Sequence, residues 1–248
     1  MASSIGEALL YALLPVAATT VGGIVASVRV PGPRTGSAIE HFAAGVILAA
    51  VAAELLPDAL HARAPWPLVI GCALAVALML GLRAVTRRLE PKEALAGRTS
   101  ADEAAVPWSF IIVAGLDTLL DGALLGIGFT AGAKQGVLLT VALTIETLAL
   151  GLSVAAALGA AGVVRRHIVA TVAGLSALFG LGALVGVVAL SGVTGAVLTT
   201  LVAFGSAILI YLVTEELLVE AHEVPETAAA TILFFAGFVL LLLIDMSL

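Results

Sequence analysis

Long apolar runs alternate with short polar breaks along the whole chain. A helix needs roughly 20 apolar residues to cross a bilayer, and the runs predict eight such helices. Glycine, proline or paired basic residues mark most of the breaks, and the uncharged break from Ser191 to Gly195 is typical of a tight turn. The expected helices cover residues about 5–27, 38–60, 66–84, 107–130, 136–159, 168–191, 195–219 and 227–246.

Composition supports the same fold class. The 248 residues are 61% hydrophobic and 11% charged, which is typical of an integral membrane protein. Because membrane β-barrels lack long apolar runs, we expect an all-α, polytopic membrane protein with a single transmembrane domain. The net charge of −6 and the absence of a basic patch argue against a nucleic-acid partner. The one cysteine, Cys72, excludes an intrachain disulfide and a thiolate metal cage.

The basic residues predict how the chain is oriented in its membrane. Residues 87–105 form the longest hydrophilic stretch, a connector that divides the helices into three before it and five after it. With the N-terminus outside, the inner connections hold nine Lys and Arg residues and the outer ones hold two. Lysine and arginine favour the cytoplasmic side, so we expect both termini outside, a cytoplasmic 87–105 connector, and a location in the plasma membrane, or the inner membrane of a bacterium.

Three carboxylates are expected near mid-membrane. Asp117 and Asp121 are four residues apart on one helix face, and Glu146 lies at similar depth in the next helix. An ionised carboxylate there costs at least ~2.5 kcal/mol unless something stabilises it. A bound cation would do so, whereas protonation, or hydrogen bonding to a neighbouring backbone carbonyl or threonine, is the alternative.

No histidine shares this depth. His41, His61, His167 and His222 all lie at the ends of the expected helices, where an interfacial or solvated position is the commoner one. The site would therefore offer oxygen ligands alone. Such ligands suit Mg²⁺, Mn²⁺ or Fe²⁺, and carboxylates also bind Zn²⁺.

The end of the second expected helix predicts an entrance path. Glu54, Asp58 and His61 follow helical spacing near the outer surface and could concentrate cations. A solvated helix end is the alternative interpretation. Pro57 is expected to kink or end the helix there.

The end of the seventh expected helix is acidic and predicts an exit path or a metal-sensing face on the cytoplasmic side. Glu215 and Glu216 should still lie at or below the predicted membrane surface. The residues expected along the path are Glu215, Glu220, His222 and Glu223, for which a solvated acidic loop is the alternative.

These features together resemble the ZIP (Zrt/Irt-like) family of metal transporters. The stretch from His41 to Asp58 is similar to the family's second span, with its F-A-x-G-V start and L-L-P-E/D end, and Asp117 to Gly122 is similar to the fourth-span H-N-x-x-D-G motif. Glu146 to Val154 is similar to the fifth-span H-N-I-P-E-G-L-A-V motif, and Glu215 to Glu220 to the seventh-span H/D-E-I-I-P-E run.

The resemblance implies a divalent-metal transporter with its ligands on the fourth and fifth spans. Asp117 and Glu146 stand at family histidine positions, and Asp121 at a family acid, so the resemblance implies that the primary site can be rebuilt from these three residues, with Glu216 as a further candidate ligand nearby. Thr118 and Thr147 stand at positions of the family's second-site ligands. The resemblance therefore implies that the second site is lost, which leaves open a harder ion than zinc, or loss of transport.

We expect a transporter that carries Zn²⁺, Fe²⁺ or Mn²⁺ into the cytoplasm, with no cofactor and no enzymatic activity. A proton-coupled transporter of a small solute and a non-transporting sensor that keeps the fold are the alternatives. Gly122, Gly126 and Gly128 give the fourth expected helix a face of small residues, which favours close helix packing. Such faces are also compatible with a homodimer.

Overall fold

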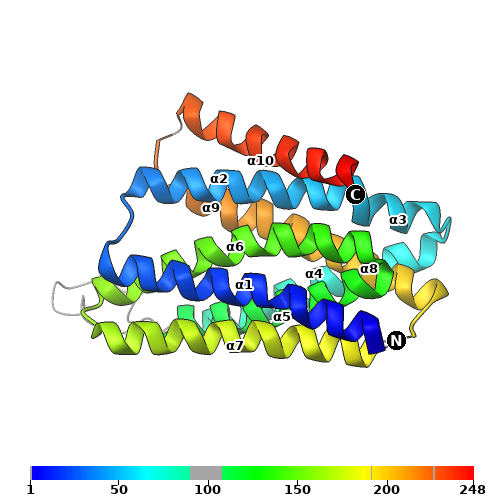
Figure 1. The fold of residues 1–248 in the computed structure, drawn as a ribbon, viewed down its shortest axis with the longest axis horizontal. Helices are drawn as coiled ribbons and strands as arrows, with labels where there is room; N and C mark the ends of the chain where they lie inside the picture. The colour runs from blue at the N-terminus through cyan, green and yellow to red at the C-terminus, as the bar shows by residue number, and fades with distance from the viewer. Residues whose placement is uncertain (1, 90–107, 191, 226) are drawn as a thin grey trace.

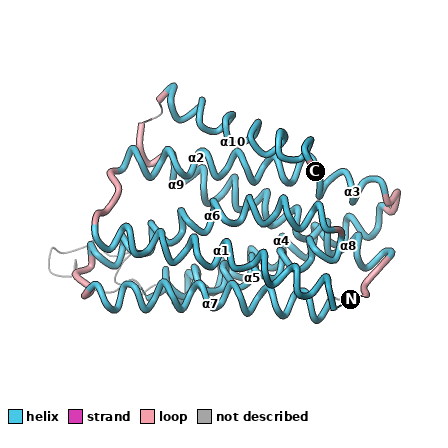
Figure 2. Tube along the Cα trace, in the orientation of Figure 1, coloured by secondary structure: helices cyan, strands magenta, loops and turns pink. Residues whose placement is uncertain are grey.

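A computed structural model describes residues 2–89, 108–190, 192–225 and 227–248. In these ranges the chain forms helices joined by short turns and no strand, and Figure 1 shows the helices running side by side along one common direction. The connections gather at the two ends of the bundle (Figure 2). The 87–105 connector lies almost wholly outside the described residues.

The helices lie close to their expected positions. Their bounds are α1 Ala2–Val28, α2 Pro33–Ala50, α3 Leu56–His61, α4 Pro65–Leu89, α5 Trp108–Ala131, α6 Ala133–Ala160, α7 Arg165–Leu190, α8 Gly195–Tyr211, α9 Leu218–Ala221 and α10 Ala228–Ser247. Within the described residues, eight helical stretches are long and apolar enough to cross a membrane, which is the architecture of a multi-pass membrane protein.

The second and third expected helices differ most from expectation: the second begins at Pro33 and not at residue 38, and the third, α4, ends at Leu89 and not at residue 84. Proline suits the first helical position, since its missing N–H is not needed there. The earlier start adds more than one turn of helix before Glu40 and His41, and both residues are buried. The solvated position expected for His41 is therefore wrong, and its Nδ1 lies 2.7 Å from the Ser37 carbonyl oxygen.

Two π-helical segments interrupt long helices beside acidic residues. The segment Val51–Leu55 joins α2 to α3 and contains Glu54, and the segment Leu212–Leu217 joins α8 to α9 and contains Glu215 and Glu216. In the first, the helix continues past Pro57 instead of ending there, because the wider turn accommodates a residue without an N–H. Such π-segments redirect the side chains around them and are frequent at functional sites.

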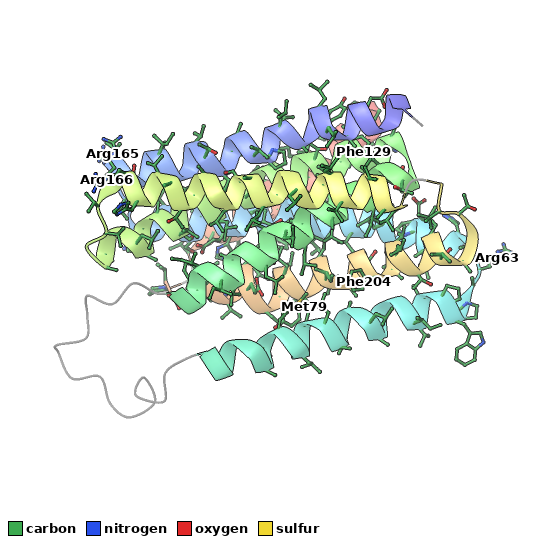
Figure 3. The ribbon with its side chains drawn as sticks, turned by 90° about the horizontal axis from the view of Figure 1, so that it is seen from below. Arg63, Met79, Phe129, Arg165, Arg166 and Phe204 are labelled. Atoms are coloured by element: carbon green, nitrogen blue, oxygen red, sulfur yellow. The ribbon has the colours of Figure 1, made fainter. Side chains whose placement is uncertain are left out.

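Packing divides the helices into two groups. Helices α1, α5, α6 and α7 pack on one another, whereas α2 packs on α10 and α4 packs on α8. The closest link between the groups is the contact of α2 with α6. Both chain ends lie at the same end of the bundle (Figure 1). Figure 3 shows Arg165 and Arg166 at one end of the bundle and Arg63 at the other.

The glycine face of α5 sets the position of its carboxylates. A Cβ on Gly122 would collide with Phe179 O and lie 2.7 Å from Ala183 N, both on α7. The expected close helix packing at Gly122 is therefore confirmed. Successive residues point about 100° apart around a helix, so with Gly122 against α7, Asp121 faces another part of the bundle.

Candidate metal centre

The structure brings together the three carboxylates that the sequence placed at matched depth. Each of the three residues contributes one carboxylate oxygen, and these oxygens, from Asp117, Asp121 and Glu146, lie within 4.8 Å of one another. Asp121 is 1% exposed and Glu146 is 4% exposed, so the deeper part of this carboxylate triad is enclosed by protein. Two antiparallel helices, α5 and α6, supply all three residues.

Within the described residues, the triad has no protein group that would neutralise it. Neither carboxylate oxygen of Asp121, nor Oε2 of Glu146, receives a hydrogen bond from a donor in the described parts of the chain. No basic side chain within those parts forms an ion pair with the triad, since Lys134 and Arg83 pair with other acids. Buried acids of this kind require either protons or an external cation.

The spacing of the triad suits one metal ion. Oxygen ligands at about 2.1 Å from an ion are at most about 4.2 Å apart. The observed limit of 4.8 Å therefore needs only a small side-chain adjustment. All three ligands are carboxylate oxygens, which favour hard or intermediate divalent cations.

The threonines beside the triad are engaged with the backbone. The Thr118 hydroxyl donates to Ala114 O at 2.6 Å, and the Thr147 hydroxyl donates to Pro15 O at 3.2 Å. Both residues are fully buried. Their hydroxyl protons thus support helix packing instead of the carboxylates, and they leave the triad without a donor.

A cavity of about 100 Å³ leads away from the triad. Asp117 and Glu146 line it, and so do Glu216 and Glu220 from the end of the α8–α9 helix. Glu216 thus shares the cavity with the triad, but it is not part of the group whose ligating atoms lie within 4.8 Å. Glu40 on α2 also lines this cavity, and the sequence reasoning missed it, because the expected second helix began only two residues earlier.

The remaining residues expected on the exit side lie apart from this cavity. Glu215 is half-exposed and its Oε2 pairs with Arg83 at 2.8 Å. The His222 ring packs edge-on against His41, with centroids 5.2 Å apart, and its Nδ1 contacts the Leu218 carbonyl oxygen. Glu223 is exposed beyond the helix end.

The residues expected on the entrance side are held in an interacting network. Lys134 Nζ lies 3.1 Å from Glu54 and 2.7 Å from Asp245. These two ion pairs join the start of α6 to the π-helical segment after α2 and to the end of α10. Gln135 donates to Asp58 at 2.8 Å. His61 is exposed at the end of α3. Sequence reasoning missed Lys134 and Asp245 as partners, because they come from distant segments.

Apolar side chains lie between the triad and a hollow on the entrance side. Asp58 and Gln135 line a hollow of about 280 Å³, to which Thr199 also contributes. Between this hollow and the triad lies a void of only about 10 Å³ among apolar side chains, including Leu55, Leu124 and Leu139. The triad therefore connects to the cavity on one side and meets apolar packing on the other.

No family model matches the chain, and no curated protein matches it. The class defined by the fold is a helical multi-pass membrane protein with a buried carboxylate triad.

Proposed function

We propose that this protein carries a divalent metal cation across a membrane and that Asp117, Asp121 and Glu146 bind the ion midway. The observation that carries the proposal is the triad itself, three buried carboxylates within 4.8 Å and without a basic partner in the described ranges. An intramembrane acid without a partner is costly, and such residues commonly mark ion pathways.

The surroundings of the triad support transport over permanent storage. A purely structural ion would be enclosed on all sides, whereas the triad adjoins a cavity lined by Glu216 and Glu220. The two helix groups meet near this site, with the triad on one group and Glu216 on the other. Movement of one group against the other would expose the triad to each side in turn, as in alternating access.

The proposed orientation assigns each end of the path to one side of the membrane. Arg165 donates to Ser27 at the end of α1, so Arg165 and Arg166 lie at the same end of the bundle as Arg29 and Arg34, which follow α1 in the sequence. This arginine-rich end is the proposed cytoplasmic end. The 3+5 division of helices around a cytoplasmic connector, and termini outside, belong to the same proposal. The acid-lined cavity then faces the cytoplasm, and a cation would enter past Asp58 and leave past Glu216 and Glu220.

Zn²⁺, Fe²⁺ and Mn²⁺ are the proposed substrates, because three carboxylate oxygens form the site. The similarity to ZIP transporters, the plasma-membrane location and a homodimeric assembly remain predictions from the sequence. A proton-coupled solute transporter and a non-transporting sensor are the rival functions, and the same experiment separates them.

The test is ion flux into liposomes that contain the purified protein. Zn²⁺, Mn²⁺, Fe²⁺, Cd²⁺ and Mg²⁺ are offered in turn to the parent, to an Asp117→Ala/Asp121→Ala variant, and to Glu7→Gln as a matched control at an exposed position. We expect saturable flux of at least one ion in the parent and the control, and none in the double variant. Equal flux in the double variant would refute the proposal. Metal binding without flux in the parent would favour a sensor. A parent that shows no metal binding and no flux would favour the proton-coupled rival.

A further inference from the structure

Glu40 is a buried acid with no assigned partner. Its side chain is 7% exposed, and no hydrogen bond or ion pair involves it in the ranges that the structure describes. Its Oε1 extends along α2 toward Gly36, and the residue lines the same cavity as Asp117 and Glu146. A carboxylate in this environment needs a compensating charge.

A second acid, Glu220, lines the same cavity. Glu220 lies on α9, which packs against α2. The Ser37 hydroxyl donates to Ala221 O at 2.8 Å, and this bond is one turn from Glu40 on one helix and one residue from Glu220 on the other. The register of α2 against α9 therefore holds the two carboxylates on the same part of the cavity wall.

The protein offers these acids little compensation of its own. Ser153 on α6 lines the cavity together with Glu220, and its hydroxyl is a neutral group. Arg34 lines a different hollow, with Ala38 and Pro225, and Arg83 is bound to Glu215. No lysine or arginine of the described ranges lines this cavity.

We propose that Glu40 and Glu220 form a second cation site, distinct from the triad, at the mouth of the cavity. This inference rests on the proposed function. The ligand is a divalent cation that keeps part of its water, because two carboxylates from two helices leave several coordination positions open. Glu216 lines the cavity together with both sites, so it offers an intermediate contact for an ion that passes from the triad to the mouth.

The experiment counts bound ions per chain in the purified full-length protein. Mn²⁺ is the first probe, with the free ion measured by electron paramagnetic resonance, and Zn²⁺ is the second, measured by elemental analysis after equilibrium dialysis. We expect two ions per parent chain, one per Glu40→Gln chain, and two in the Glu7→Gln control. Glu220→Gln serves as a second variant, with the same expected loss of one ion, if Glu40→Gln does not fold.

Asp121→Asn separates this inference from the proposed function. We expect this variant to lose the central ion and all flux but to keep the mouth ion, whereas Glu40→Gln keeps the central ion and a slower flux. A parent that binds at most one ion of either metal would overturn the second site, and so would mouth variants that still bind two. If Asp121→Asn keeps full flux while Glu40→Gln loses an ion, the proposed function fails and the mouth site stands.

Discussion

The triad predicts an unusual relation between stability and function at Asp121. Replacing Asp121 with Asn keeps the size of the side chain and removes its capacity for negative charge. In the ion-free protein, an ionised carboxylate at this depth costs about 2.5–3.5 kcal/mol, while a protonated one costs far less. The substitution should therefore leave the ion-free protein as stable as the parent, or more stable by up to about 3 kcal/mol.

The same substitution should abolish stabilisation by metal. An ion that binds only the folded state adds about 2.7 kcal/mol when its free concentration is about 100 times Kd. The parent should show this gain, and Asp121→Asn should show almost none, because one of three ligands within 4.8 Å is lost. Without metal, Asp121→Asn would thus be at least as stable as the parent, and with metal the parent would be the more stable of the two.

Thermal unfolding in detergent, with and without Mn²⁺ or Zn²⁺, measures both quantities. Glu7→Gln is the control, since it makes the same acid-to-amide change at an exposed residue. A marked fall in the unfolding temperature of ion-free Asp121→Asn would show that the carboxylate is a structural hydrogen-bonding group. That result, or a metal shift equal to that of the parent, would refute the reasoning.

Three other outcomes are expected. Gly122→Ala should destabilise the protein by about 1–3 kcal/mol through overpacking against α7, whereas Gly174→Ala, which meets no atom within 4 Å, should not; equal unfolding temperatures would contradict the packing. Lys134→Met should loosen the entrance side, so that a cysteine introduced at Thr199 is labelled faster by an impermeant thiol reagent. Lys134→Arg should leave the labelling rate unchanged. Equal labelling rates in the two variants would exclude a closing role for the ion pairs of Lys134. In intact cells a cysteine at the exposed position Val164 should resist that reagent, and rapid labelling would reverse the proposed orientation.

The helices were predictable because each apolar run is long enough to cross a bilayer, where backbone groups must bond within their own segment. Helices α7 and α8 are an example, since both were predicted although only a glycine turn separates them, with φ of 84° at Gly192 and 62° at Gly195. The start of α2 was predicted less well, because apolar character rises only after residue 38, although Pro33 already begins the helix. That difference of five residues concealed the burial of Glu40.

The candidate site was partly predictable for the same local reasons. Asp117 and Asp121 share a helix face by their spacing, and a short connection places α6 beside α5, so Glu146 joins them. The partners of Glu54 could not be read from the sequence. They are Lys134 and Asp245, and their pairing depends on how α6 and α10 pack against α2.

The sequence by itself determined the helical membrane architecture and the matched depth of the triad, because hydrophobic length and helical periodicity are local properties. Only the tertiary structure decided which acids are paired and which are left without a partner. Glu215 lies one residue from Glu216, yet it pairs with Arg83 while Glu216 lines the cavity with the triad. Helix packing and the π-helical turn make that choice, since neighbouring residues on a helix point in different directions.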